Sequence, residues 1–113
     1  MFNHESKQSN RKILQIDLSK VILSDGHSFQ VVESTTEILD RINSHADYIR
    51  LCEFVNLDHV KHLLIRTSLI NIAETDHATY IYDNEDELHE MVDRYNQTIK
   101  RAGTKRGGIE YGK

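Results

Sequence analysis

The sequence contains no proline, no tryptophan and a single cysteine among its 113 residues. One cysteine, Cys52, excludes an internal disulfide and a zinc site built from several thiolates, and it agrees with a reducing compartment. No apolar run approaches the roughly 20 residues that cross a bilayer. The opening MFNHESKQSNRK also lacks the apolar segment of a secretory signal. We therefore expect a cytoplasmic protein that does not enter a membrane.

Glycine is also scarce, with five residues: Gly26, Gly103, Gly107, Gly108 and Gly112. None of them builds a phosphate-cradling loop between a strand and a helix. A length of 113 residues with 38% hydrophobic and 28% charged residues predicts one small domain with a modest core. We place this domain at residues 12–101, between a flexible N-terminal tail at 1–11 and a flexible, basic, glycine-rich tail at 102–113.

The net charge of −4 is unevenly distributed along the chain. Residues 1–12 carry three bases and one acid, and residues 100–113 carry five bases and one acid, which give +2 and +4. Residues 13–99 carry 16 acids and 6 bases, which give −10. The sequence therefore predicts an acidic body with basic ends.

The dipeptide Asp25-Gly26 between two β-prone runs predicts a β-hairpin, because both residues tolerate positive φ in a two-residue turn. Counting outward from that turn pairs Ile22 with Phe29 and Lys20 with Val31. Side chains two apart in a strand share a face. One face of the hairpin should then be apolar, consisting of Leu14, Ile16, Leu18, Ile22, Phe29 and Val31.

Two helices are predicted from capping boxes, in which a polar side chain and a carboxylate three residues later satisfy free N–H groups of the first turn. The first box, Ser34 to Glu37, predicts a helix that ends near residues 43–45. The second box, Asn84 to Glu87, predicts a helix that runs to about Arg101. Its apolar stripe is Leu88, Met91, Val92, Tyr95 and Ile99.

Between the helices, β-prone runs at residues 48–55, 60–67 and 78–82 predict a meander with polar turns at NLD and ETDH. The intervening stretch SLINIAE is ambiguous, since residues 67–69 fit a helical turn and residues 71–74 fit a short strand. The predicted fold is α+β, a mostly antiparallel sheet made of the N-terminal hairpin plus a three-strand meander. Two helices pack against it, in the order β-β-α-β-β-β-α.

The segment KVILSDGHSFQVVESTTEILDRI, residues 20–42, resembles the hairpin-plus-helix unit of FlbD-type small flagellar proteins. It covers about a fifth of the chain. The resemblance implies a hairpin followed by a helix, and no residue role is carried over from it.

Six acidic residues and no basic one lie between Asp83 and Asp93. The helix dipole favours carboxylates in the first turn, which explains half of them. The outward face presents Glu85, Asp86, Glu90 and Asp93. Such a face can steer a basic protein partner through complementary potential, or it can be a solvated surface that aids solubility.

The predicted function is a small non-catalytic protein-binding or regulatory module that engages a basic partner through this acidic face. Inhibitors from phages and mobile elements that act on nucleic-acid enzymes are one class of such proteins. An unpaired sheet edge offers a second route to partners, including a homodimer.

A first alternative is a nucleic-acid-associated accessory protein that uses the basic C-terminal tail. Its candidate contacts are Lys100, Arg101, Lys105, Arg106 and Tyr111, since bases attract phosphate and tyrosine stacks on nucleobases. The acidic body opposes phosphate, so nucleic acid is expected to bind only through this tail.

A second alternative is metal binding by His59 and His62, because imidazole is a common ligand of zinc and related ions. On a strand, however, a separation of three residues places these two side chains on opposite faces. Cys52 lies in an expected strand and fits a small buried hydrophobic residue better than a nucleophile. We therefore predict no catalytic residue, no cofactor and no enzyme activity.

Overall fold

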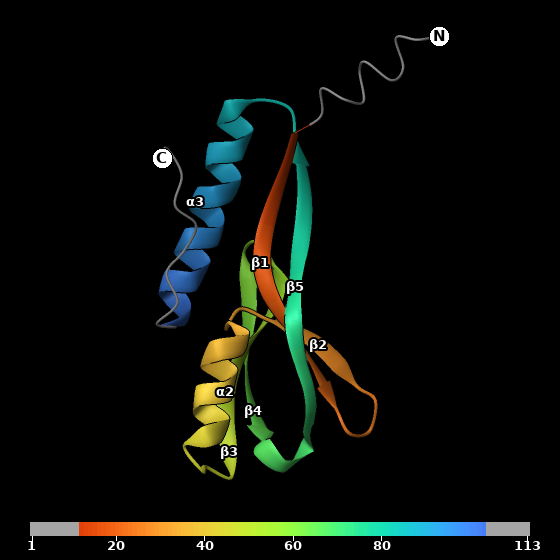
Figure 1. Ribbon diagram of the computed structural model, residues 1–113. Helices are drawn as coiled ribbons and strands as arrows, with labels where there is room; N and C mark the ends of the chain where they lie inside the picture. Colours follow the sequence, from red (N-terminus) through yellow and green to blue (C-terminus); the bar gives the residue numbers. More distant parts are fainter. Residues whose placement is uncertain (1–11, 104–113) are drawn as a thin grey trace, which may run out of the picture.

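The computed structural model describes residues 12–103, which form five strands and two α-helices in the order β-β-α-β-β-β-α (Figure 1). All strand pairs are antiparallel, and the α+β prediction is confirmed. The strands are β1 (Lys12–Leu23), β2 (Ser28–Val31), β3 (Tyr48–Asn56), β4 (His59–Arg66) and β5 (Ile70–Tyr82). The helices are α2 (Thr35–Asn43) and α3 (Glu85–Ala102), and a short 3-10 helix, η1 (Thr67–Leu69), joins β4 to β5. Neither α-helix has the length and apolar content of a membrane-spanning segment.

The strand order is β4-β3-β2-β1-β5, which differs from the predicted meander in the position of β5. β3 and β4 form the expected pair, but β5 lies beside β1 along the full length of both strands (Figure 1). The predicted polar turn at residues 74–77 is wrong, because β5 continues through it. Polar residues are tolerated there since β5 is an edge strand, and Glu74 and His77 are exposed.

The hairpin between β1 and β2 turns through three residues instead of two. The Leu23 N–H donates to the His27 carbonyl at 2.8 Å, which leaves residues 24–26 as the loop. Gly26 has a φ of 94°, a conformation that glycine adopts without steric cost. This arrangement is typical of three-residue loops that end in a left-handed glycine.

The longer loop shifts the register of β1 and β2 by one residue. Lys20 lies opposite Gln30 and not opposite Val31, so the predicted pairing is wrong. A shift of one residue turns every side chain to the other face. Phe29 and Val31 therefore pack with Val21, on the face opposite to the one predicted for them.

Each face of the sheet carries its own core cluster. The cluster beneath α3 contains Leu14, Ile16, Leu18, Val32, Cys52, Phe54, Leu57, Val92, Tyr95 and Ile99. The cluster beneath α2 contains Val21, Val31, Ile38, Ile49, Leu51 and Ile65. Because strand side chains alternate between faces, the neighbours Leu51 and Cys52 belong to different clusters. The two clusters therefore lie on opposite faces of the sheet. The two helices lie beside different halves of the long β1–β5 pair (Figure 1).

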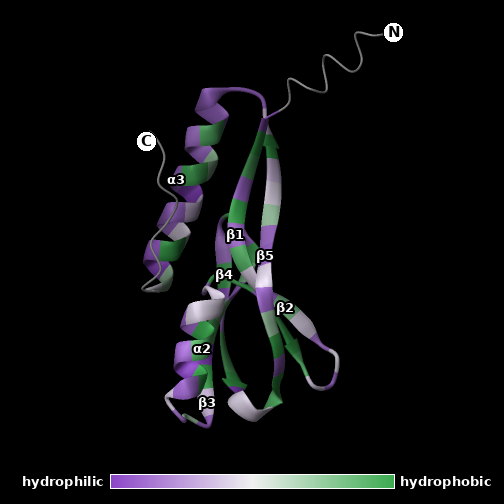
Figure 2. Cartoon of the chain, in the orientation of Figure 1, coloured by the Kyte–Doolittle hydropathy of each residue, from purple (hydrophilic) through white to green (hydrophobic). Residues whose placement is uncertain are grey.

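Local signals set the ends of both helices. The Ser34 hydroxyl accepts the Glu37 N–H, and the Glu37 carboxylate accepts the Ser34 N–H, so the first capping box is confirmed. At α3 the Asn84 side chain accepts the Glu87 N–H, but the Glu87 carboxylate accepts the N–H of Asp83 instead. Figure 2 shows hydrophilic and hydrophobic residues mixed along α3, as expected for a helix that buries one side.

Candidate functional site

The four acidic residues predicted on the outward face of α3 are all exposed there: Glu85, Asp86, Glu90 and Asp93. Three of them border a shallow groove of about 560 Å³. This α3 groove is lined by Asp58, Asp86, His89, Glu90, Asp93, Arg94, Gln97 and Arg101. Asp58 comes from the turn between β3 and β4, so the groove has one wall on α3 and a rim on that turn. Glu85 lies outside it and contacts His89 at 3.6 Å.

The two arginines of the α3 groove are directed toward Asp58. Arg94 donates from Nε at 2.9 Å and from Nη2 at 2.5 Å, which is a bidentate contact with the Asp58 carboxylate. Arg101 donates to the backbone carbonyl of Asp58 at 3.4 Å. The hydrogen bonds from Arg94, and then the charges of Arg94 and Arg101, lower the pKa of Asp58 below its ordinary value.

The carboxylates of Asp86 and Glu90 are less engaged than that of Asp58. Among residues 12–103, the side chains of Asp86 and Glu90 form no hydrogen bond or salt bridge to another residue. The hydrogen bond to Asp58, and then the charges of Asp58 and Glu90, raise the pKa of the Arg94 guanidinium. With four carboxylates and two guanidinium groups in its lining, the α3 groove has a formal charge of −2 when His89 is neutral.

Thr98 connects the β3–β4 turn, which forms the rim of the α3 groove, to helix α3. This side chain is 3% exposed, and its hydroxyl donates to the Leu57 carbonyl at 2.6 Å. The same oxygen lies 2.9 Å from the carbonyl of Arg94, one turn earlier in α3. Thr98 therefore holds the β3–β4 turn against the helix, at the position where Asp58 can meet Arg94.

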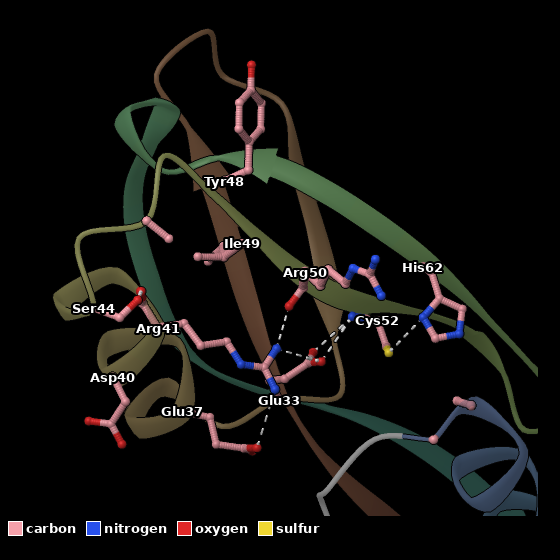
Figure 3. A pocket seen from close by; sticks show the side chains of 13 residues that line it. Glu33, Glu37, Asp40, Arg41, Ser44, Tyr48, Ile49, Arg50, Cys52 and His62 are labelled. Carbon is pink, nitrogen blue, oxygen red and sulfur yellow. Dashed lines mark hydrogen bonds and ion pairs between the residues drawn. The ribbon is translucent and has the colours of Figure 1, made fainter.

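A second pocket, of about 680 Å³, opens where α2, β3, β4 and the end of α3 meet (Figure 3). We call it the Glu33 pocket, and its lining includes Glu33, Glu37, Asp40, Arg41, Arg50, Cys52 and His62. Glu33 is 1% exposed, which is unusual for a carboxylate. A buried charged group in a pocket is common in active sites. The hydrogen-bond and ion-pair partners of Glu33 show whether its role is catalytic or structural.

Glu33 forms its contacts with residues of β3 and α2. Both carboxylate oxygens accept the Cys52 N–H, at 3.0 and 3.1 Å, and Arg41 forms a salt bridge at 3.3 Å. Arg41 also donates to the Arg50 carbonyl. In a continued antiparallel ladder, the Cys52 N–H would donate to a backbone carbonyl of the neighbouring strand. Because β2 ends here, the Glu33 carboxylate accepts this N–H in place of that carbonyl. Glu33 therefore connects β3 to α2, and its charge is already compensated.

Cys52 and His62 point toward one another across β3 and β4, with 3.7 Å between Sγ and Nδ1 (Figure 3). Burial, and then the charge of Glu33, raise the pKa of the thiol to about 11. A nucleophilic cysteine requires the thiolate, which this environment disfavours. The predicted burial of Cys52 is confirmed, since it is 5% exposed.

The two histidines proposed as metal ligands both lie on β4, and His62 is the one that faces Cys52. Within residues 12–103, no three side chains of histidine, cysteine, aspartate or glutamate come together as a metal site would require. Lys100 and Arg101 lie in the last turn of α3. The other proposed nucleic-acid contacts, Lys105, Arg106 and Tyr111, lie outside the described residues.

The Glu33 network was not found by sequence reasoning. A signal was present, because Glu33 lies two residues after the apolar Val31 in an extended segment and so shares its inward face. The contact of Asp58 with Arg94 had no such signal, since 36 residues separate the two side chains.

No protein-family model matches this chain, and no curated protein or solved structure shows significant similarity to it.

Proposed function

We propose that the protein is a small, non-catalytic protein-binding or regulatory module of the cytoplasm, and that its α3 groove receives arginine or lysine side chains of a basic protein partner. A nucleic-acid enzyme, whose groove must attract phosphate, is one class of partner with such a surface. The observation that carries the proposal is the division of charge in the α3 groove. Arg94 and Arg101 are both directed to Asp58, and the carboxylates of Asp86 and Glu90 remain exposed beside them.

The geometry supports binding by charge complementarity more than by burial of apolar surface. The α3 groove is shallow, and six of its eight lining residues are charged. Exposed ion pairs contribute only about 0 to 1 kcal/mol each. A partner must therefore engage several carboxylates at once, and the interaction should be sensitive to salt because exposed charges are screened.

The Glu33 pocket gives less support to a catalytic function than the α3 groove gives to partner binding. Its buried carboxylate is bound by Cys52 and Arg41, and its thiol is held in the protonated form. General acid–base or nucleophilic catalysis needs a group that is free to exchange a proton or to attack a substrate. These contacts favour a structural role for the network.

The test is capture of partners by the full chain, immobilised through an N-terminal tag, with the bound proteins identified by mass spectrometry. The variant Asp86→Lys with Glu90→Lys should lose the partner that the original chain retains. Raising the salt from about 0.15 M to about 1 M should release it, because the Debye length falls from about 8 Å to about 3 Å.

A matched control reverses two exposed carboxylates elsewhere, with Asp40→Lys and Asp47→Lys. Both double variants change the net charge by the same amount, so a loss confined to the first one assigns the contact to the α3 groove. Equal capture by the original chain and the Asp86 and Glu90 variant would reject the proposal.

A further inference from the structure

We propose that the outer edge of β5 pairs with β5 of a second copy of this chain, antiparallel and over residues 76–82, so that two sheets join into one. This interface does not involve the α3 groove. It rests on the exposed backbone of β5, on a contrast between the two edges of the sheet, and on the order of charges along the strand.

β5 is one of the two edge strands, and it spans 13 residues. Its inner edge pairs with β1 from Lys12↔Tyr82 to Leu23↔Ile70. Within residues 12–103, no backbone–backbone hydrogen bond outside the sheet ladders involves residues 71–82, but His77 is engaged by side chains: its N–H donates to the Asp76 carboxylate at 2.9 Å, and its carbonyl accepts from Gln30 at 3.2 Å. The other outward N–H and C=O groups of β5 are therefore available to another extended strand, and pairing at His77 requires Asp76 and Gln30 to release its backbone groups.

The two edges of the sheet differ in how they are protected. Proteins blunt exposed edges with short strands, proline and charged residues, lysine above all. β4 has eight residues and carries His59, Lys61, His62 and Arg66. β5 is longer and contains no lysine, arginine or proline. Self-pairing is therefore expected at β5 and not at β4.

The last part of β5 is the favourable segment. Residues 78–82 read ATYIY, which is uncharged and rich in residues that prefer strands. Ile81 is 55% exposed and lies opposite Ile13 of β1, which is 59% exposed. This isoleucine pair lies on the sheet face opposite to the α3 cluster. An added strand would cover part of its apolar surface.

The charges of β5 select the register of the pairing. A two-fold axis at Thr79 places Asp76 of one copy opposite Tyr82 of the other, so that no carboxylate faces a carboxylate. An axis at Thr75 would place Glu74 opposite Asp76, and like charges directly opposite are destabilising. In the favoured register, residues directly opposite share a face, and both isoleucine pairs lie on the same side of the joined sheet.

The experiment measures the mass of the full chain by sedimentation or light scattering over about a hundredfold range of concentration, because dimer stability depends on protomer concentration. We expect a concentration-dependent rise from 13.2 kDa to twice that mass. Ile81→Lys should raise the dissociation constant at least about tenfold, which corresponds to 1.4 kcal/mol. Thr79→Lys, at an exposed position near the proposed axis, is the second variant if Ile81→Lys fails to fold.

The matched control is Leu64→Lys on β4, the other edge, where the side chain is 65% exposed. It should leave the dissociation constant unchanged, and circular dichroism should show that each variant is folded. A monomer at every concentration would overturn the proposal, as would a dimer that Leu64→Lys weakens and the folded β5 variants do not.

Discussion

The backbone N–H of Cys52 donates to both carboxylate oxygens of Glu33, although 19 residues separate the two along the chain. A charged side chain here performs the task of a strand carbonyl. It lets β2 end and α2 begin while the buried N–H group of β3 keeps a hydrogen bond. Arg41 of α2 then compensates the charge, so one carboxylate connects a strand to a helix.

Replacing Glu33 should therefore destabilise the fold more than an ordinary surface substitution. Glu33→Ala leaves the Cys52 N–H without its acceptor and removes the nearer counter-charge of Arg41, which keeps only its 3.9 Å contact with Glu37. We expect a loss of about 3 kcal/mol in the free energy of unfolding. Glu33→Gln keeps one acceptor and should cost less. Denaturant unfolding measures both values.

The control for Glu33 is Glu37→Gln, because glutamine can also complete a capping box and Glu37 is only partly buried. That variant should change the free energy of unfolding by less than about 1 kcal/mol. A Glu33→Ala loss no larger than that of the control would contradict the role given to this carboxylate.

Thr98 should be needed to hold the β3–β4 turn against α3. Thr98→Val keeps the shape of the side chain and removes the hydroxyl, so the buried Leu57 carbonyl loses its donor. We expect a loss of about 1 to 2 kcal/mol in the free energy of unfolding, and Thr98→Ser should recover much of it. Equal stability of the valine variant and the original chain would show that the hydrogen bond contributes little.

The thiol of Cys52 should react slowly in the folded protein. With a pKa of about 11, only about 0.1% of the thiol is thiolate at pH 8, against about a quarter for an ordinary cysteine of pKa 8.5. Its reaction with a disulfide reagent at pH 8 should be at least about a hundredfold slower than in denaturant. Similar rates in the two states would mean that the thiolate is accessible.

The contact of Asp58 with Arg94 should produce a measurable pH dependence. Since Arg94 lowers the pKa of Asp58 in the folded state, the stabilisation is present above the unfolded pKa of about 3.9 and is lost as the pH falls through the lower folded value. In Arg94→Gln, the pKa of Asp58 should rise toward about 3.9. Titration of the Asp58 carboxyl by NMR measures the change, and an unchanged pKa would contradict the assignment.

Local patterns in the sequence were sufficient for the class of the fold, the order of its elements and the ends of its helices. Capping residues such as Ser34 and Asn84 act within four residues, so their effect can be read without knowing the rest of the chain. The exposure of Glu85, Asp86, Glu90 and Asp93 also followed from helical periodicity alone.

The tertiary structure decided which distant segments meet. One additional loop residue at the β1–β2 turn places Val31 on the other face of the sheet. β5 pairs with the long strand β1 and not with β4. The partners of Glu33 and Asp58 likewise come from segments joined by the sheet and by α3. Strand pairing and burial are satisfied over the whole chain at once, so neither follows from the neighbours of any single residue.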